Sequence, residues 1–184
     1  MNWGVSLSLY RTNLYDLIDR VRSDYLGSPI YNGQNVYKKE NIARAVIQGC
    51  ESDVEIHLFP SFVLYGSLVY TYGHNQTANE PMRRIPPLHG KTGVRLSTAS
   101  FWTDLVLQFA QRQGRLASGD RDDHRIPPGG THGWEVVHLN SGYQSSRFRF
   151  SFGLQNLFNK AYRWHGSGID AYGRSIWIGG DIRL

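Results

Sequence analysis

The stretch Arg147-Phe148-Arg149-Phe150-Ser151-Phe152-Gly153-Leu154-Gln155-Asn156 alternates apolar with polar or small residues. Successive side chains of a β-strand point to opposite faces, so the phenylalanines and the leucine lie on one face and the residues between them on the other. A period of two over this length predicts a strand with one apolar and one polar face.

The same alternation recurs along most of the chain. It is clear in residues 62–72, 101–112 and 175–184, and weaker in residues 3–21, 46–58, 92–98 and 134–143. We therefore expect about eight antiparallel strands, most of them about ten residues long or longer, which is the length that crosses a bilayer at a tilt.

The predicted strands are joined by two kinds of connection. Short turns fall at residues 59–61, 98–100 and 144–146, and long polar loops at residues 23–39, 76–88, 117–133 and 164–173. Outer-membrane barrels alternate tight periplasmic turns with longer external loops. The spacing therefore predicts that both ends of the chain lie on the periplasmic side.

The composition agrees with strands that are apolar on one face only. Aromatic residues make up 13% of the chain and charged residues 19%, with a mean hydropathy of −0.42. The formal net charge is +5, but the basic residues are scattered singly, which argues against nucleic-acid binding. One cysteine, Cys50, excludes an intrachain disulfide and a cysteine-based zinc cluster. No apolar stretch approaches the ~18 residues of a membrane helix, so we expect any membrane crossing to be a barrel.

A soluble β-sandwich is the alternative fold, because its strands also alternate apolar and polar residues. Such a domain would serve as a ligand-binding module, for example for carbohydrate, through exposed Trp and Tyr side chains. The strand lengths exceed the ~5 to 6 residues usual in soluble sheets, and aromatic residues gather near the predicted strand ends. Both features favour the membrane barrel.

Two motifs resemble stretches of TonB-dependent outer-membrane receptors. Residues 153–162, Gly-Leu-Gln-Asn-Leu-Phe-Asn-Lys-Ala-Tyr, resemble the G-x-x-N-L-F-(N/D)-K-x-Y stretch of that family's penultimate strand. A short loop, residues 165–169, and then Gly173-Arg174 follow as they do in the family. Residues 45–51 resemble the family's A-x-x-x-G-x-E strand, and the resemblance extends from about Trp3 to Leu184.

The resemblance implies an all-β fold, an antiparallel up-and-down transmembrane β-barrel segment of about eight strands in the bacterial outer membrane. A whole receptor closes roughly 22 strands around a plug. We find no signal peptide, TonB box or plug, so residues 1–184 are expected to be the carboxy-terminal part of such a barrel. The implied function is TonB-dependent uptake of scarce ligands such as ferric siderophores or vitamin B12.

The resemblance also implies a set of partners. They are outer-membrane lipid, the barrel assembly machinery, a small-molecule or metal-chelate ligand, and TonB through the missing amino-terminal part only. The assembly machinery typically reads a glycine followed by alternating hydrophobic residues up to an aromatic terminus. Gly179, Ile182 and Leu184 fit this spacing. Leu184 stands where an aromatic residue is usual, which predicts weaker recognition.

No arrangement of residues predicts catalysis, so we expect neither an enzyme nor a cofactor or metal site. The most polar cluster is Asp120-Arg121-Asp122-Asp123-His124-Arg125 in a predicted external loop. Within it Arg121, Asp122, Asp123 and His124 are the candidate contacts to a metal chelate or an anionic ligand. A solvated surface loop is the alternative interpretation.

A second polar row lies along one predicted strand. Glu51, Asp53, Glu55 and His57 alternate there and should face the barrel lumen if the residues between them face lipid. Metal binding is one interpretation of this row. The alternative is a hydrated lumen wall, or a wall that packs on a plug.

Overall fold

The computed structural model describes residues 1–183, with the side chains of residues 19, 42 and 43 left out. Eight strands make up its main sheet: β1 (Asn2–Arg22), β4 (Tyr37–Phe59), β5 (Phe62–Asn75), β7 (His89–Ser97), β8 (Phe101–Ala110), β9 (Trp134–Gln144), β10 (Phe148–Gln155) and β11 (Ser175–Ile182). The short elements are β2 (Ile30–Tyr31), β3 (Gln34–Asn35), β6 (Glu80–Pro81) and the helix α1 (Ser118–Arg121).

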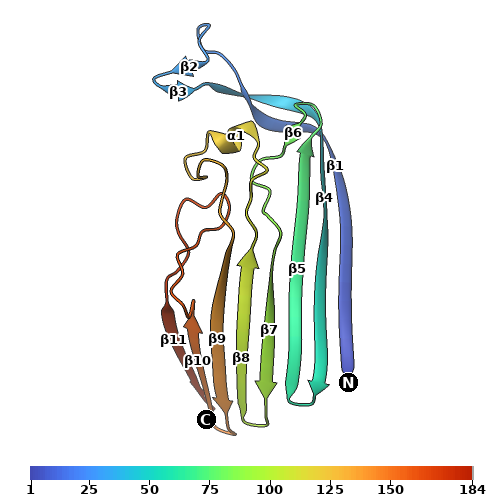
Figure 1. The fold of residues 1–184 in the computed structure, drawn as a ribbon, viewed down its shortest axis with the longest axis vertical. Coiled ribbons are helices and arrows are strands. Elements are labelled where there is room, and N and C mark those ends of the chain that lie inside the picture. The colour runs from blue at the N-terminus through green and yellow to red at the C-terminus, as the bar shows by residue number, and fades with distance from the viewer. Residues whose placement is uncertain (184) are drawn as a thin grey trace.

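The main strands form an antiparallel meander in which each strand pairs with its neighbours along the chain. The order is β1-β4-β5-β7-β8-β9-β10-β11, with β6 attached to β5. This confirms the predicted all-β, up-and-down architecture of about eight strands. Within the described residues no ladder joins β1 to β11, so the sheet is open, with these two strands at its edges (Figure 1).

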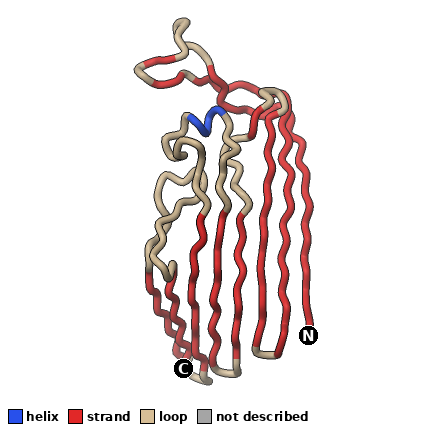
Figure 2. The backbone as a smooth tube through the Cα atoms, viewed as in Figure 1, coloured by secondary structure: helices blue, strands red, loops and turns tan. Residues whose placement is uncertain are grey.

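Long and short connections lie at opposite ends of the sheet, as predicted. Figure 2 shows the tight turns at the end that also holds both termini, and the long loops at the other end. We refer to these as the turn end and the loop end. The predicted loop over residues 23–39 was partly wrong, because β2, β3 and the start of β4 lie within it. In Figure 1, β1 and β4 continue past the ends of the other strands and carry the β2–β3 hairpin.

The strand register gives the sheet one apolar and one polar face. Phe152 of β10 pairs with Ser141 and Ile178, and its neighbour Gly153 pairs with Asn140 and Trp177. The large apolar side chains exposed on the apolar face include Trp3, Leu7, Val54, Leu68, Leu96, Phe101, Leu105, Phe148, Phe150, Phe152, Ile176 and Ile178. Exposed apolar side chains in such a continuous row are typical of a surface that meets lipid.

The polar face carries most of the buried strand residues, among them Val63, Asp104, Trp134 and Val136. Asp104 of β8 accepts hydrogen bonds from Tyr65 of β5 at 2.8 Å and from Arg95 of β7 at 3.0 Å. This carboxylate therefore links three strands across the polar face. No second sheet packs on either face within the described residues, since the β2–β3 hairpin lies beyond the strand ends. A soluble β-sandwich thus has no support.

Glycines on the polar face make room for aromatic side chains of the next strand. A Cβ atom at Gly153 would overlap the indole of Trp177, and one at Gly142 would overlap the indole of Trp102. Each tryptophan therefore lies flat across the backbone of the neighbouring strand, an arrangement that only glycine permits. The alternation in β10 therefore places large apolar side chains on one face and, at Gly153, leaves room on the other face for a neighbouring tryptophan.

Glu51, Asp53, Glu55 and His57 of β4 lie on the polar face, as their spacing predicted. On the β1 side Ser8 pairs with Glu51 and Ser6 with Asp53, and on the β5 side Val69 pairs with Glu51 and Ser67 with Asp53. His57 contacts Glu55 at 2.6 Å between Nε2 and Oε1. Among the described residues no group of three or more His, Cys, Asp or Glu side chains is arranged to hold a metal ion.

Replacing Phe150 with arginine should destabilise the protein in a bilayer by about 2–4 kcal/mol if the residue lies near mid-bilayer, because it places a charge on the lipid face. The matched control is Ser151→Arg, which puts the same side chain on the polar face one residue away. Denaturant unfolding of the protein reconstituted in lipid vesicles measures both changes. Equal losses for the two variants would contradict the assignment of the faces.

Candidate ligand-binding site

The site is built on the loop over residues 111–133, which connects β8 to β9. Its neck is closed by backbone hydrogen bonds between Gln113 and Thr131, at 2.9 and 3.1 Å. Gly130 has a φ of 104° and lies against the Gln113 carbonyl, where a side chain would not fit. The Gln113 amide also donates to the Ile85 carbonyl at 2.7 Å. The loop is therefore held against the neighbouring loop over residues 76–88.

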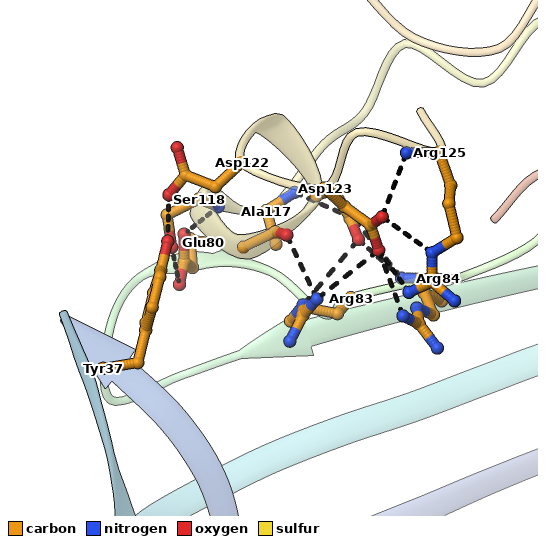
Figure 3. Close-up of polar contacts among 11 residues, drawn as sticks. Tyr37, Glu80, Arg83, Arg84, Ala117, Ser118, Asp122, Asp123 and Arg125 are labelled. Carbon is orange, nitrogen blue, oxygen red and sulfur yellow. Dashed lines mark hydrogen bonds and ion pairs between the residues drawn. The ribbon is translucent and has the colours of Figure 1, made fainter. Parts of the chain in front are cut away.

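Helix α1 strengthens the junction between these two loops. The Ser118 backbone N–H and hydroxyl donate to the Glu80 carboxylate at 2.8 and 3.1 Å (Figure 3). The side chain of Asp120 is 1% exposed and accepts a hydrogen bond from the Arg84 backbone N–H at 3.2 Å. Buried carboxylates need such donors, because desolvation of an unpaired charge is costly. The two acids thus fix α1 over residues 80–84.

Asp123 is the centre of the strongest polar contacts in the site. Arg125 binds it with two parallel hydrogen bonds, at 2.8 and 2.6 Å, and Arg84 donates to Oδ2 at 3.0 Å. Arg83 lies 3.8 Å from the same oxygen (Figure 3). Two-pronged arginine–carboxylate contacts are among the stronger hydrogen bonds in proteins. One buried carboxylate therefore gathers three arginines, which leaves an excess of positive charge around it.

Asp122 ties the loop to the long extension formed by β1 and β4. Its carboxylate accepts two hydrogen bonds from Arg22, at 3.1 and 2.9 Å, and one from the Tyr37 hydroxyl. The Tyr37 hydrogen bond and the charge of Arg22 hold the pKa of Asp122 below its usual range. Arg22 and Asp122 are 100 residues apart in the sequence. The contact joins the end of β1 and the start of β4 to the helix.

These contacts surround an open pocket of about 600 Å³ at the loop end of the sheet. Its lining comprises Arg20, Tyr37, Arg83, Arg84, Gly119, Asp122, Asp123, His124 and Arg125. Four arginines therefore face two carboxylates, so the pocket is net positive. Guanidinium groups in this density bind carboxylate, phosphate and similar anionic groups well.

The structure brings together only part of the predicted set. Asp122, Asp123 and His124 line the pocket, whereas Arg121 is not among its lining residues and is exposed to solvent. Arg84 and Arg125 donate hydrogen bonds to Asp123, so this carboxylate holds the two arginines in position. Arg83 and Tyr37 also line the pocket but were not predicted, because they come from another loop and from a strand. The one sequence feature that pointed to them was the run of aspartates at residues 120–123, because buried carboxylates are usually paired with cations. Ligand binding by Arg121, Asp122, Asp123 and His124 stays a prediction.

The proposed assembly signal lies at the turn end. Gly179 and Ile182 belong to β11, and Ile182 is exposed on the apolar face. Leu184 lies outside the described residues. Recognition of these three residues by the assembly machinery stays a prediction.

The motif over residues 153–162 was expected to lie in a strand, but most of it lies in the loop after β10. β10 ends at Gln155, so only the first three residues of the motif are extended. Asn156 is 1% exposed and has a positive φ of 49°. Its amide donates to the carbonyls of Lys160 at 2.8 Å and Tyr172 at 2.9 Å, and its oxygen accepts from the Lys160 N–H. The motif asparagine thus ends the strand and organises the loop over residues 156–174.

Long strands with one exposed apolar face, tight turns at one end and long loops at the other define the wall of an outer-membrane β-barrel. The sequence model of the family described as TonB dependent receptor-like, beta-barrel matches residues 1–157. The chain therefore belongs to the TonB-dependent receptor family, whose members are bacterial outer-membrane β-barrel proteins. No curated protein sequence matches it. Among the described residues no helix has the length and apolar character needed to cross a membrane.

Solved structures of this family share the fold. The structure described as copper transporter OprC is 22% identical, with a TM-score of 0.83 over 98% of this chain and 29% of its own. The ferric enterobactin receptor PfeA from Pseudomonas aeruginosa is 16% identical, with a TM-score of 0.69 over 96% of this chain and 28% of its own. An FrpB iron transporter from Neisseria meningitidis is 11% identical, with a TM-score of 0.72 over 97% of this chain and 28% of its own. This chain thus spans less than a third of these relatives.

Asp123→Ala should loosen α1 and the loop around it by about 2 kcal/mol, because three arginines lose the carboxylate that holds them. Hydrogen exchange of the amides over residues 117–126 should then speed up about 30-fold. Asp170→Ala is the matched control. It breaks a contact to Arg163 in which the aspartate side chain is 60% exposed, and such pairs contribute little. Unchanged exchange in Asp123→Ala would contradict the central role of this carboxylate.

The contact between Asp122 and the extension should be sensitive to acid. A carboxylate whose pKa is lowered on folding stabilises the fold above its ordinary pKa and loses that contribution as the pH falls through the lowered value. We expect the distance between spin labels at Gly27 and His124 to be narrowly distributed at pH 7 and to broaden progressively below about pH 4. Cys50→Ser removes the native thiol. In Asp122→Ala the distance distribution should be broad at both pH values. A narrow distribution at pH 7 in this variant would contradict the role of Asp122 in holding the extension.

Proposed function

We propose that this chain is part of an outer-membrane receptor that takes up a scarce ligand, such as a ferric siderophore or vitamin B12, in a TonB-dependent manner. The observation that carries the proposal is the net positive pocket at the loop end of a sheet from this receptor family. In the proposed orientation the long loops lie outside the cell and the turn end lies in the periplasm. The pocket is then the first part of this chain that an external ligand meets.

The charge of the pocket favours an anionic ligand over a bare metal ion. Four arginines repel a free cation, whereas they attract the carboxylate or phenolate oxygens of a negatively charged chelate. The structural relatives include a copper transporter and a ferric enterobactin receptor. The arginine content of this pocket supports a metal chelate as the ligand here.

We further propose that residues 1–184 form the carboxy-terminal part of the barrel. The remaining strands would pair with the free edges of β1 and β11, since an unpaired backbone group in hydrocarbon costs several kcal/mol. Plug and TonB contacts would come from the rest of the receptor. The apolar face would meet outer-membrane lipid, and β11 would present the signal for the assembly machinery. Binding and transport involve no bond-making step, so the proposal assigns no enzymatic activity.

The test is uptake by the full-length product of the gene in a receptor-deficient strain. Labelled ferric siderophores, vitamin B12 and free copper form the ligand panel, each measured with and without TonB. We expect uptake of an anionic chelate that disappears without TonB. Arg84→Gln should weaken binding of that chelate about tenfold or more, because a charged hydrogen-bond donor is lost. Lys38→Gln is the control, since it removes the same charge from outside the pocket.

Several results would contradict parts of the proposal. Uptake of free copper alone would contradict the choice of an anionic chelate. Equal effects of Arg84→Gln and Lys38→Gln on binding would show that the pocket does not bind the ligand. Uptake supported by residues 1–184 expressed alone behind an export signal would contradict their role as one part of a larger barrel.

A further inference from the structure

A third loop, which connects β10 to β11, reaches the arginine pocket. A Cβ atom at Gly166 would lie 3.6 Å from Cγ of Arg84. One at Gly168 would lie 3.3 Å from Cδ of Arg125. Both arginines donate hydrogen bonds to Asp123 (Figure 3). The backbone of this loop therefore packs on the side chains that bind the central carboxylate of the pocket.

Aromatic contacts hold the loop against the polar face of the sheet. The ring centroids of Tyr162 and Trp164 lie 4.5 and 4.6 Å from that of Trp134, which is buried in β9. Such ring pairs stabilise a contact beyond the area that they bury. The Ser167 N–H donates to the Trp164 carbonyl at 3.0 Å and closes a tight turn. His165 lies inside this turn, so its position is fixed by the sheet and by the loop itself.

The His165 ring is bound on one side only. Its Nδ1 lies 2.9 Å from the hydroxyl oxygen of Thr131, a buried residue at the neck of the neighbouring loop. Its Nε2 is buried and has no hydrogen-bond partner in the part of the chain that the structure describes. Buried nitrogen atoms of this kind are uncommon, because the loss of hydration is not offset. Both ring nitrogens donate in the charged form, and the Thr131 hydroxyl can accept one of these bonds.

Charged groups from both adjoining loops act on this ring. Burial lowers the pKa of His165, and the Arg84 guanidinium lowers it further. The carboxylates of Asp120 and Asp123 act in the opposite direction. Arg125 packs on the same loop. The imidazole is therefore mostly neutral at pH 7, in a place where two carboxylates and two arginines determine its charge.

An anion in the pocket changes this balance. Negative charge beside Arg84 offsets the repulsion between its guanidinium and a charged His165. A charged His165 in turn compensates Asp120 and Asp123, so that less of the arginine charge is neutralised by these acids. Each event therefore favours the other. Two binding events that interact in this way must strengthen each other by the same factor.

We propose that His165 makes anion binding by the arginine pocket proton-linked, so that the pocket binds its ligand more tightly when this imidazole is charged. The inference rests on the proposed function of the pocket and concerns the regulation of that site. His165 is a positioning residue, because it acts through the arginines and is not among the residues that line the pocket. Binding should therefore become tighter at mildly acidic pH.

The test measures sulfate binding to the full-length gene product in mild detergent by titration calorimetry, at about pH 7.5 and about pH 5.5. Sulfate stays a dianion at both pH values, so the probe itself takes up no proton. His124 is exposed and lines the pocket, so all measurements use the His124→Gln protein. We expect sulfate to bind about 5- to 10-fold more tightly at the lower pH, since tenfold corresponds to one pKa unit between the free and bound forms.

Replacement of His165 with glutamine should remove the pH dependence and little else. Glutamine does not titrate but can still form a hydrogen bond with Thr131. In the His124→Gln protein, His165→Gln should bind sulfate normally at the higher pH and gain nothing at the lower pH. His132→Gln is the matched control, because it removes an exposed histidine of the neighbouring loop that does not line the pocket, and it should keep the gain. Titrations in two buffers of different ionisation enthalpy should also show proton uptake with sulfate, and His165→Gln should abolish it.

Arg84→Gln separates this inference from the proposed function. It should weaken sulfate binding about tenfold or more at both pH values, because a charged donor is lost. Sulfate binding that depends on Arg84 but not on pH would overturn the role of His165 and leave the anion site intact. Equal losses at both pH values in His165→Gln would reduce that residue to a structural role and overturn the proposal. Absent sulfate binding, or binding unaffected by Arg84→Gln, would contradict the anion site and this inference together.

Discussion

In the hydrocarbon of a bilayer every backbone N–H and C=O group must find its partner within the protein. The ladder that runs from β1 to β11 satisfies this requirement for the interior strands, because each pairs on both sides. The requirement also explains where irregular structure occurs. The short turns and the long loops lie at the two ends of the sheet, where water can solvate the backbone.

The ladder has the further effect of sorting side chains by solvent. In a strand the two faces alternate strictly, so a sheet with lipid on one side places polar and small residues on the other. The polar face then develops its own packing. Trp177 over Gly153 and the Tyr65–Asp104–Arg95 contacts join neighbouring strands there.

Outside the strands, contacts of aspartate carboxylates with arginines and backbone N–H groups hold the loops in place. The loop over residues 111–133 buries the apolar side chains of Leu116 and Ile126, and three aspartates in addition bind residues from other parts of the chain. Asp120 binds residue 84, Asp123 binds Arg84 and Arg125, and Asp122 binds Arg22. Because the acids are used to hold arginines in place, the net charge left facing the pocket is positive. The functional character of the site follows from this arrangement.

The sequence by itself determined the strands, their two faces and the order of short and long connections. These are local properties, since a period of two is read within one segment and turns follow from the residues between segments. The acidic run at residues 120–123 could be found in the same way, but not its arginine partners. Only the tertiary structure decided that Asp122 meets a residue 100 positions away and that Asn156 leaves the strand to bind residues 160 and 172. Such contacts depend on which loops the sheet brings to one end, and no local pattern records that placement.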